Sequence, residues 1–315
     1  MENIHPNTVI KFNPNQLSDV RKTFGYNDVN KLNQDLDHFE EWVRKQNHFV
    51  VKNIGMNYLE RFLMTNKGLI ERAKKRLDIL LTLRNLIPEM LKNYDIKNEF
   101  KFFFPYKCSR LTFVILPTPT KDNYRVVVVK IHGGTYEGLE LVTYYRYMSV
   151  LLEYMLTHDY NAGVEFILDA RDMGIGILSK INPITIHKST TMLEAYGLRL
   201  KKLHFVSGSK FFDSVLSLIR QGLSQKLRER IQVHTTIETL KDCVSKEFLP
   251  KDYGGDEGCL KEISDTIFKE VSSEKHIKWM KLAESMVTDE SLRLSSKFNE
   301  DYSGMPGSFK TLCVD

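Results

Sequence analysis

Strand-like and helical segments alternate from about Phe100 to residue 236, and this alternation limits the possible folds more than any other feature. The strand-like runs are RLTFVIL, YRVVVVKI, GVEFILDA, KKLHFVS and RIQVHTT. Strands that alternate with helices form sheets with crossover helices. VVVVKI and VEFILDA are apolar at successive positions, as strands covered on both faces are. The sequence therefore predicts an α/β fold with a mostly parallel sheet.

The segment before residue 95 has a helical pattern instead. Apolar residues recur every three or four positions from Val29 to Val43, after a possible cap at Asn27 or Asp28. A later run restarts at Leu69 after the interruption NKG, and its apolar face is Leu69, Ala73, Leu77, Leu80 and Leu81. We therefore expect an N-terminal helical bundle over residues 1–95 and a sheet domain over 96–260.

The last fifty residues are charged and predict a helical extension with a tail over 261–315. We expect one helix from about Leu260 to Met286, followed by a final dozen poorly ordered residues. The apolar positions expected to pack on the sheet domain are Ile263, Ile267, Val271, Trp279, Leu282 and Met286.

The stretch KFFDSVLSLIRQGLSQKLRERI, residues 210–231, changes from apolar to basic at Gly222. On a continuous helix its apolar stripe, made of Phe212, Val215, Ile219 and Leu223, would continue into Lys226 and Arg230. A glycine break resolves this conflict, so we expect an apolar helix, a hinge and a short basic helix. Between Arg199 and Arg230, eight basic residues face two acidic ones. Such a cluster is typical of an anion site, or of a solvated helix end favoured by the helix dipole.

Signals for catalysis or a metal are weak. Gly174 and Gly176 lack the third glycine of a dinucleotide fingerprint, and Asp169 with Asp172 is more typical of strand-end turns. His132 beside a Gly-Gly turn has a structural interpretation as well. The four cysteines and nine histidines show no ligand spacing. We expect neither an enzyme nor a metal site.

Overall charge and hydropathy exclude other classes. A formal net charge of +5 is too small for a surface devoted to nucleic acid. The sequence shows no secretory signal and no apolar stretch of transmembrane length. We therefore expect a cytoplasmic protein that associates with membranes only transiently.

The C-terminal half of the sheet region resembles the CRAL-TRIO (Sec14-like) lipid-binding family. KLRERIQVH and LPKDYGGDEG carry the resemblance, with Leu249, Pro250, Asp252, Tyr253, Gly254 and Gly255 matching the family's closing run. YLERFLMTNKGLIERA is similar to the family's N-terminal helical module. The resemblance spans roughly residues 25–290 and is closest to the α-tocopherol transfer protein branch, including its insect members.

The resemblance implies a lipid cage with a sheet floor, closed by a mobile gate helix near residues 209–221. Ser207, Gly208 and Ser209 replace the usual start of the gate and imply a flexible hinge. The positions implied for the lipid pocket are Tyr145, Met148, Leu152, Val164, Leu168, Met173, Ile181, Tyr196, Leu200, Leu203, Phe212, Val215, Ile219 and Leu223. Those implied for a phosphoinositide headgroup are Arg199, Lys201, Lys226 and Arg230.

The implied function is transfer of a small hydrophobic ligand, such as tocopherol, a retinoid, a carotenoid or a terpenoid, to phosphoinositide-containing membranes. No cofactor is expected apart from this ligand. Met148 and Leu152 stand where the tocopherol pocket has serines, so the resemblance does not specify the ligand. Two alternatives remain open: a phosphatidylinositol or phospholipid exchange protein, and a phosphoinositide-sensing interaction module.

Overall fold

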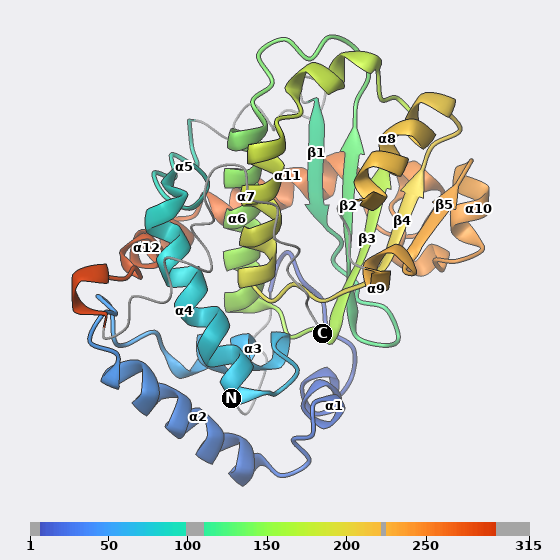
Figure 1. Ribbon diagram of the computed structural model, residues 1–315. Helices are drawn as coiled ribbons and strands as arrows, with labels where there is room; N and C mark the ends of the chain where they lie inside the picture. Colours follow the sequence, from blue (N-terminus) through green and yellow to red (C-terminus); the bar gives the residue numbers. More distant parts are fainter. Residues whose placement is uncertain (1–6, 99–109, 222–224, 294–315) are drawn as a thin grey trace.

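A five-stranded sheet, covered by helices on both sides, forms the centre of the molecule (Figure 1). The computed structural model describes residues 7–98, 110–221 and 225–293. The strands lie in the order of the chain: β1 Leu111–Ile115, β2 Tyr124–Ile131, β3 Gly163–Asp169, β4 Leu200–Val206 and β5 Ile231–His234. Strand β1 pairs antiparallel with β2, and the remaining neighbours are parallel. The predicted mostly parallel α/β sheet is therefore confirmed, with all five strands in the expected segments.

Crossover helices connect the parallel strands, as they must when neighbouring strands run in the same direction. They are α6 Leu141–His158, α7 Pro183–Ala195, α8 Lys210–Gln221 and α9 Gln225–Arg228, with the 3₁₀ helix η2 Ile175–Lys180 before α7. Helices α8 and α9 correspond to the predicted apolar and basic helices. The break expected between them at Gly222 lies outside the described residues, as does Leu223.

The N-terminal helices are present as predicted, and the group packs on the crossover helices α6 and α7. They are α1 Gln16–Thr23, α2 Val29–Lys45, α3 Met56–Thr65, α4 Ile70–Leu86 and α5 Pro88–Leu91. Asp28 caps α2 through a hydrogen bond from the Asn30 amide, 2.8 Å. Helix α4 begins one residue later than its pattern suggested. Leu69 is therefore the N-cap residue and is 55% exposed, although the periodicity placed it on the buried face.

The C-terminal region corrects the expectation of one helix from Leu260 to Met286. It contains α10 Ile237–Lys241, η3 Lys246–Phe248, η4 Lys251–Tyr253, α11 Leu260–Val271, α12 Glu274–Ser285 and η5 Glu290–Leu292. Helix α11 ends at Ser272, and Ser273 starts α12 by accepting a hydrogen bond from the His276 amide. The turn points Leu282 towards solvent, at 40% exposure, whereas Met286 is buried. The predicted disordered tail lies outside the described residues.

Helix α11 crosses behind the sheet against β1, while α6, α7 and α8 lie in front of it (Figure 1). The extended residues before α1 reach the sheet domain: the Lys11 amide donates to the Pro117 carbonyl, 3.0 Å. On the other side, Arg84 of α4 pairs with Glu153 of α6. The division at residues 95 and 260 remains a prediction, because buried contacts cross both of these positions.

Candidate lipid and membrane site

The front face of the sheet and the inner side of α8 are apolar and in contact. Leu168 and Phe205 are paired neighbours on β3 and β4, so their side chains share a face. The Phe205 ring centroid lies 5.9 Å from that of Phe212 on α8. Phe212 and Val215 are buried, and Leu203 lies two residues before Phe205 on the same face. Four predicted lipid positions therefore meet between β3, β4 and the gate helix.

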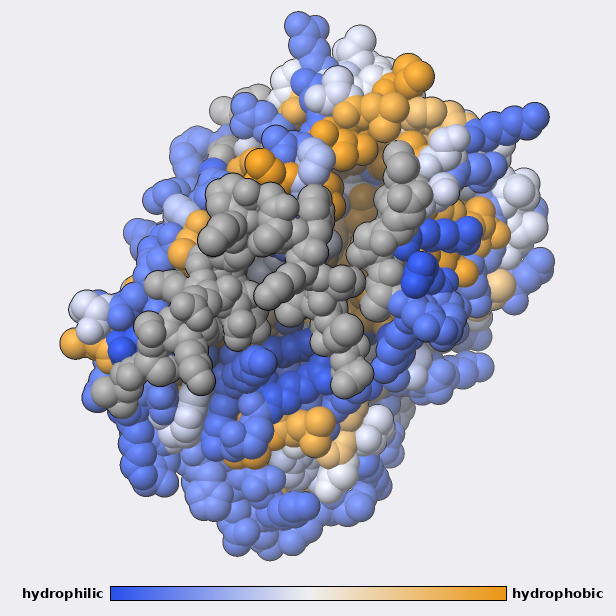
Figure 2. All heavy atoms as spheres, in the orientation of Figure 1, coloured by the Kyte–Doolittle hydropathy of each residue, from blue (hydrophilic) through white to orange (hydrophobic). Residues whose placement is uncertain are grey.

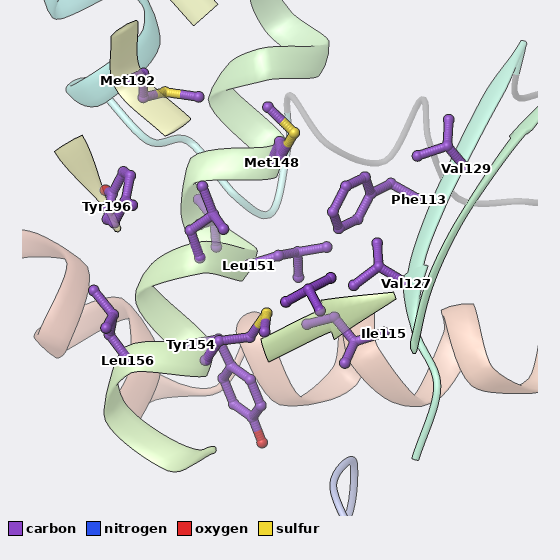
Figure 3. Close-up of a cluster of buried hydrophobic side chains, with 14 of the residues drawn as sticks. Phe113, Ile115, Val127, Val129, Met148, Leu151, Tyr154, Leu156, Met192 and Tyr196 are labelled. Carbon is purple, nitrogen blue, oxygen red and sulfur yellow. The ribbon is translucent and has the colours of Figure 1, made fainter. Parts of the chain in front are cut away.

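Strand β3 is incompletely covered on this face. Figure 3 shows Phe113 and Val129, from β1 and β2, facing Met148 on α6. Helix α8 covers Phe205 on β4, on the other side. Between these two covers, Phe166 and Leu168 of the central strand are only half-buried. A strip of apolar surface on the sheet is therefore available beneath the edge of the gate helix.

A partly open cavity lies between α3, α6 and the beginning of β3. It offers about 40 Å³ to water-sized molecules and brings the predicted residues Leu152, Val164 and Tyr196 together with Arg199. The Tyr196 hydroxyl donates to Glu153, 2.8 Å, so its polar end is already satisfied. A space of this size holds about one or two waters. A lipid therefore needs movement of the surrounding elements before it can enter.

The remaining predicted lipid positions lie around these two regions. Tyr145 is half-buried beside Ser189, which opposes the rise in the Tyr145 pKa caused by burial. Leu200 is half-buried at the start of β4, and Met173 follows β3 at the upper rim of the sheet. Ile181 is 39% exposed. Ile219 belongs to α8, and its side chain lies outside the described residues.

Arg199, Lys201, Lys226 and Arg230 gather where β4 begins and α9 ends, as the sequence predicted. Burial lowers the pKa of Lys201, and the charges of Arg199 and Arg230 lower it further. Arg230 donates to the Leu200 carbonyl, which fixes it against β4. In the described ranges, none of the four forms an ion pair with a carboxylate. The cluster is therefore a concentrated positive charge at the C-terminal end of the gate helix.

Sequence reasoning missed two cations of the same cluster, Lys67 and Arg72, which come from the N-terminal helices. Burial lowers the pKa of Lys67, and Arg72, Lys226, Arg199 and Arg230 lower it further. More than 120 residues separate Arg72 from Arg199, so spacing could not join them. The sequence offered one sign of this second part of the cluster, the basic residue Lys67 in the NKG turn.

A second missed feature is an exposed apolar rim that follows β3. Its residues recur every third position: Ile175 (72% exposed), Leu178 (42%), Ile181 (39%) and Ile184 (66%). Residues three apart lie above one another in a 3₁₀ helix. Figure 2 shows hydrophobic side chains gathered along the upper edge of this face. The three-residue spacing of these apolar positions is visible in the sequence. The sequence does not show whether their side chains face the core or the solvent.

The rim is held in place by a buried tyrosine. The Gly174 amide donates to the Tyr136 hydroxyl, 2.9 Å, and that hydroxyl donates to the His132 carbonyl, 3.2 Å. Ile177, between the exposed positions, is 5% exposed and anchors η2. The exposed side chains are therefore presented by an ordered segment.

Comparison with known proteins agrees with this architecture. The model of the CRAL/TRIO domain matches residues 110–255, and the model of a Pinta-like UBA domain matches residues 28–100. Residues 110–255 therefore form a CRAL/TRIO domain, the domain of a class of lipid-binding and lipid-transfer proteins rather than enzymes.

The named relatives share about one fifth of their aligned residues with this chain. The mouse protein called alpha-tocopherol transfer protein-like is 21% identical over 252 residues, which are 78% of this chain and 71% of that protein. Its human and Pongo abelii counterparts are 21% identical over 234 residues, 72% of this chain and 66% of theirs. The crystal structure of Sfh5 aligns with a TM-score of 0.44 and 14% identity, covering 81% of this chain and 93% of Sfh5.

Of the helices within 7–98, 110–221 and 225–293, none is both long enough and apolar enough to span a membrane.

Proposed function

We propose that this protein binds a small hydrophobic ligand between the sheet and α8 and releases it at phosphoinositide-containing membranes. The ligand class is an isoprenoid such as a tocopherol, retinoid, carotenoid or terpenoid. One observation carries the proposal: α8 covers apolar sheet residues, and cations that form no ion pair with any described carboxylate gather at its C-terminal end. The names of the mammalian relatives support a lipid cargo.

Energetics explain why release needs a membrane. A ligand that buries roughly 500 Å² of apolar surface gains about 12 kcal/mol before the costs of binding are subtracted. Spontaneous escape into water is therefore slow, and opening must be coupled to an acceptor. Cations near an anionic leaflet contribute about 1 kcal/mol each, less at high salt. The basic cluster supplies enough bias to favour an open gate at such a surface.

The exposed rim supports membrane contact at the other end of α8. Ile175 and Leu178 lie on the segment that follows β3, and Lys210 begins the gate helix directly after β4, a neighbouring strand. Apolar side chains presented singly are ordinary, whereas four on one ordered segment are typical of an interaction surface. We infer that this rim contacts acyl chains while the basic cluster contacts headgroups.

The test is organic extraction of the purified protein followed by mass spectrometry, combined with transfer to vesicles. A neutral isoprenoid and faster release to phosphoinositide vesicles are expected. A bound phospholipid would instead favour an exchange protein. Extraction of no lipid from a protein that still binds phosphoinositide vesicles would indicate a sensing module.

A further inference from the structure

The turn between α3 and α4 has a fixed conformation. Lys67 and Gly68 both have left-handed backbone angles, with φ of 67° and 68°. The Lys67 amide donates to the Met64 carbonyl, 3.0 Å, and the Gly68 amide donates to the Leu63 carbonyl, 2.9 Å. This pattern ends a helix with its last carbonyls satisfied. The direction in which the chain leaves α3 is therefore determined locally.

Contacts from outside the turn fix it further. The Tyr26 hydroxyl lies 2.9 Å from the Asp35 carboxylate and 3.1 Å from the Gly68 carbonyl oxygen, so its one proton is shared between these two acceptors. A β-carbon at Gly68 would lie 2.6 Å from the Phe24 carbonyl oxygen, so only glycine fits. The Arg199 guanidinium lies 4.4 Å from the centroid of the Phe24 ring. Phe24 thus connects the turn to the basic end of β4.

Leu69 follows this turn and is 55% exposed. One exposed leucine is ordinary on a protein surface. Here, however, the backbone on its N-terminal side is rigid, and α4 begins immediately after it. The side chain is therefore held outward by the fold.

The surroundings of Leu69 are cationic. Lys67 and Arg72 flank it in sequence. Besides burial, the charges of Arg72, Arg199 and Arg230 lower the pKa of Lys67. Arg72 in turn lowers the pKa of Arg199, and Lys67 lowers that of Lys201. The nearby acids have other partners. Glu71 binds Lys74, 2.7 Å, and Glu229 accepts from Gln225, 3.0 Å.

Asp122 also acts on Lys201, and it is exposed. Six cations act on one another beside the turn and form no ion pair in the part of the chain that the structure describes. They are Lys67, Arg72, Arg199, Lys201, Lys226 and Arg230. An exposed leucine next to a cationic cluster has the chemistry of a bilayer interface, where acyl chains lie directly beneath phosphates.

We propose that residues 67–72 anchor the N-terminal helical module to an anionic membrane, with Leu69 entering the headgroup layer between lipid phosphates. This anchor rests on the proposed release at phosphoinositide membranes and adds a contact from outside the CRAL/TRIO domain. A protein partner would need an apolar patch to match, whereas Leu69 stands alone among cations. The anchor and α9 contact the same leaflet, so the N-terminal module holds the basic end of the gate against the bilayer.

The test compares Leu69→Ser with Leu86→Ser, which changes an exposed leucine at the other end of α4. Serine is a better helix N-cap than leucine, so loss of folding does not explain a defect at position 69. We expect Leu69→Ser to weaken binding to phosphatidylcholine vesicles containing phosphatidylinositol 4,5-bisphosphate by about tenfold. Leu86→Ser should bind like the wild type. Binding of soluble inositol trisphosphate should be unchanged in both variants, because the cations remain.

Tryptophan substitutions provide a second measurement. The added fluorescence of Leu69→Trp should be quenched by brominated lipids, and that of Leu86→Trp should not. Wild-type vesicle binding by Leu69→Ser, without quenching at position 69, would overturn the anchor. If Lys226→Glu still abolishes binding in that case, the proposed function stands and only the anchor fails. If the wild type binds no vesicle at all, the proposed function fails first.

Discussion

Arg84 and Glu153 form a fully buried ion pair between helices α4 and α6, with Nη2 and Oε1 2.5 Å apart. Glu153 also accepts hydrogen bonds from Tyr196 and Trp279. Burial is the largest influence on the Arg84 pKa and lowers it, but Glu153 and the neighbouring tyrosines together outweigh burial, so the Arg84 pKa is raised. One carboxylate thus links the N-terminal module, the crossover helix and the C-terminal extension.

Replacing Glu153 with alanine should lower the free energy of unfolding by about 3–5 kcal/mol, because it leaves the Arg84 charge buried and unpaired. Chemical denaturation measures the loss. The control is Glu41→Ala, which removes the exposed Glu41–Lys45 pair and should lower the free energy of unfolding far less. Equal losses in the two variants would contradict this account.

Leu168→Trp should prevent loading of an apolar ligand while the protein remains folded. Leu168 is half-buried on the central strand, so a larger ring can occupy the uncovered strip. Ligand titration combined with a thermal melt gives the answer. Val29→Trp, at an exposed position of α2, should load normally. Normal loading of the Leu168 variant would place the ligand elsewhere.

Lys226→Glu should weaken binding to phosphoinositide vesicles and slow ligand release to them. Lys226 is exposed on α9 and belongs to the unpaired cationic cluster, so reversing its charge adds repulsion from the leaflet. Ligand affinity in solution should not change. Lys278→Glu, on the distant helix α12, serves as the matched control. The rate of ligand release is measured for each variant at low and at high salt. A release rate that changes neither with salt nor with Lys226→Glu would refute electrostatic coupling.

Acid should destabilise the protein through His276. This side chain is 2% exposed, and neither ring nitrogen has a hydrogen-bond partner among the described residues. Burial, and then His158, lowers its pKa to about 3. The unfolded chain takes up a proton near the ordinary histidine value, about 6.5, and the folded chain does not. Stability is therefore complete above about pH 6.5 and falls towards pH 3, by about 1.4 kcal/mol per pH unit.

His276→Leu removes this proton uptake, so its unfolding free energy should depend less steeply on pH between 6 and about 4. Denaturation at several pH values measures the slope. Part of the slope should persist because His204, buried beside His234, also has its pKa lowered to about 4. An unchanged slope in the variant would show that His276 is not the responsible group.

The sheet was predictable because its signal is local. Each strand is a short apolar run between turns, and helices lie on both sides of the sheet, so VVVVKI and VEFILDA could be identified directly. The paired helices α8 and α9 followed from the conflict between an apolar stripe and the cations Lys226 and Arg230. Both predictions used neighbouring residues only.

The parts that were missed depend on packing between distant segments. Lys67 and Arg199 are brought together by Phe24, which no spacing rule connects. Leu69 fits the apolar periodicity of α4, but the helix begins after it, and helix ends are decided by capping rather than by periodicity. The turn at Ser273 divides the predicted C-terminal helix because a serine cap competes with helix continuation.

The gate helix is itself the link between two adjacent parallel strands, β4 and β5. Its N-terminal tether is Ser207–Ser209, and the Ser207 amide is bonded to the His234 carbonyl at the end of β5. Its C-terminal tether leads to Arg230, just before β5. The Arg230 carbonyl accepts a hydrogen bond from the Leu203 amide on β4. While these strands stay paired, the proposed opening of α8 is limited to rotation about its two tethers. The length of these two tethers therefore limits the width of the opening through which the proposed ligand leaves. Shortening either tether should restrict binding to narrower ligands.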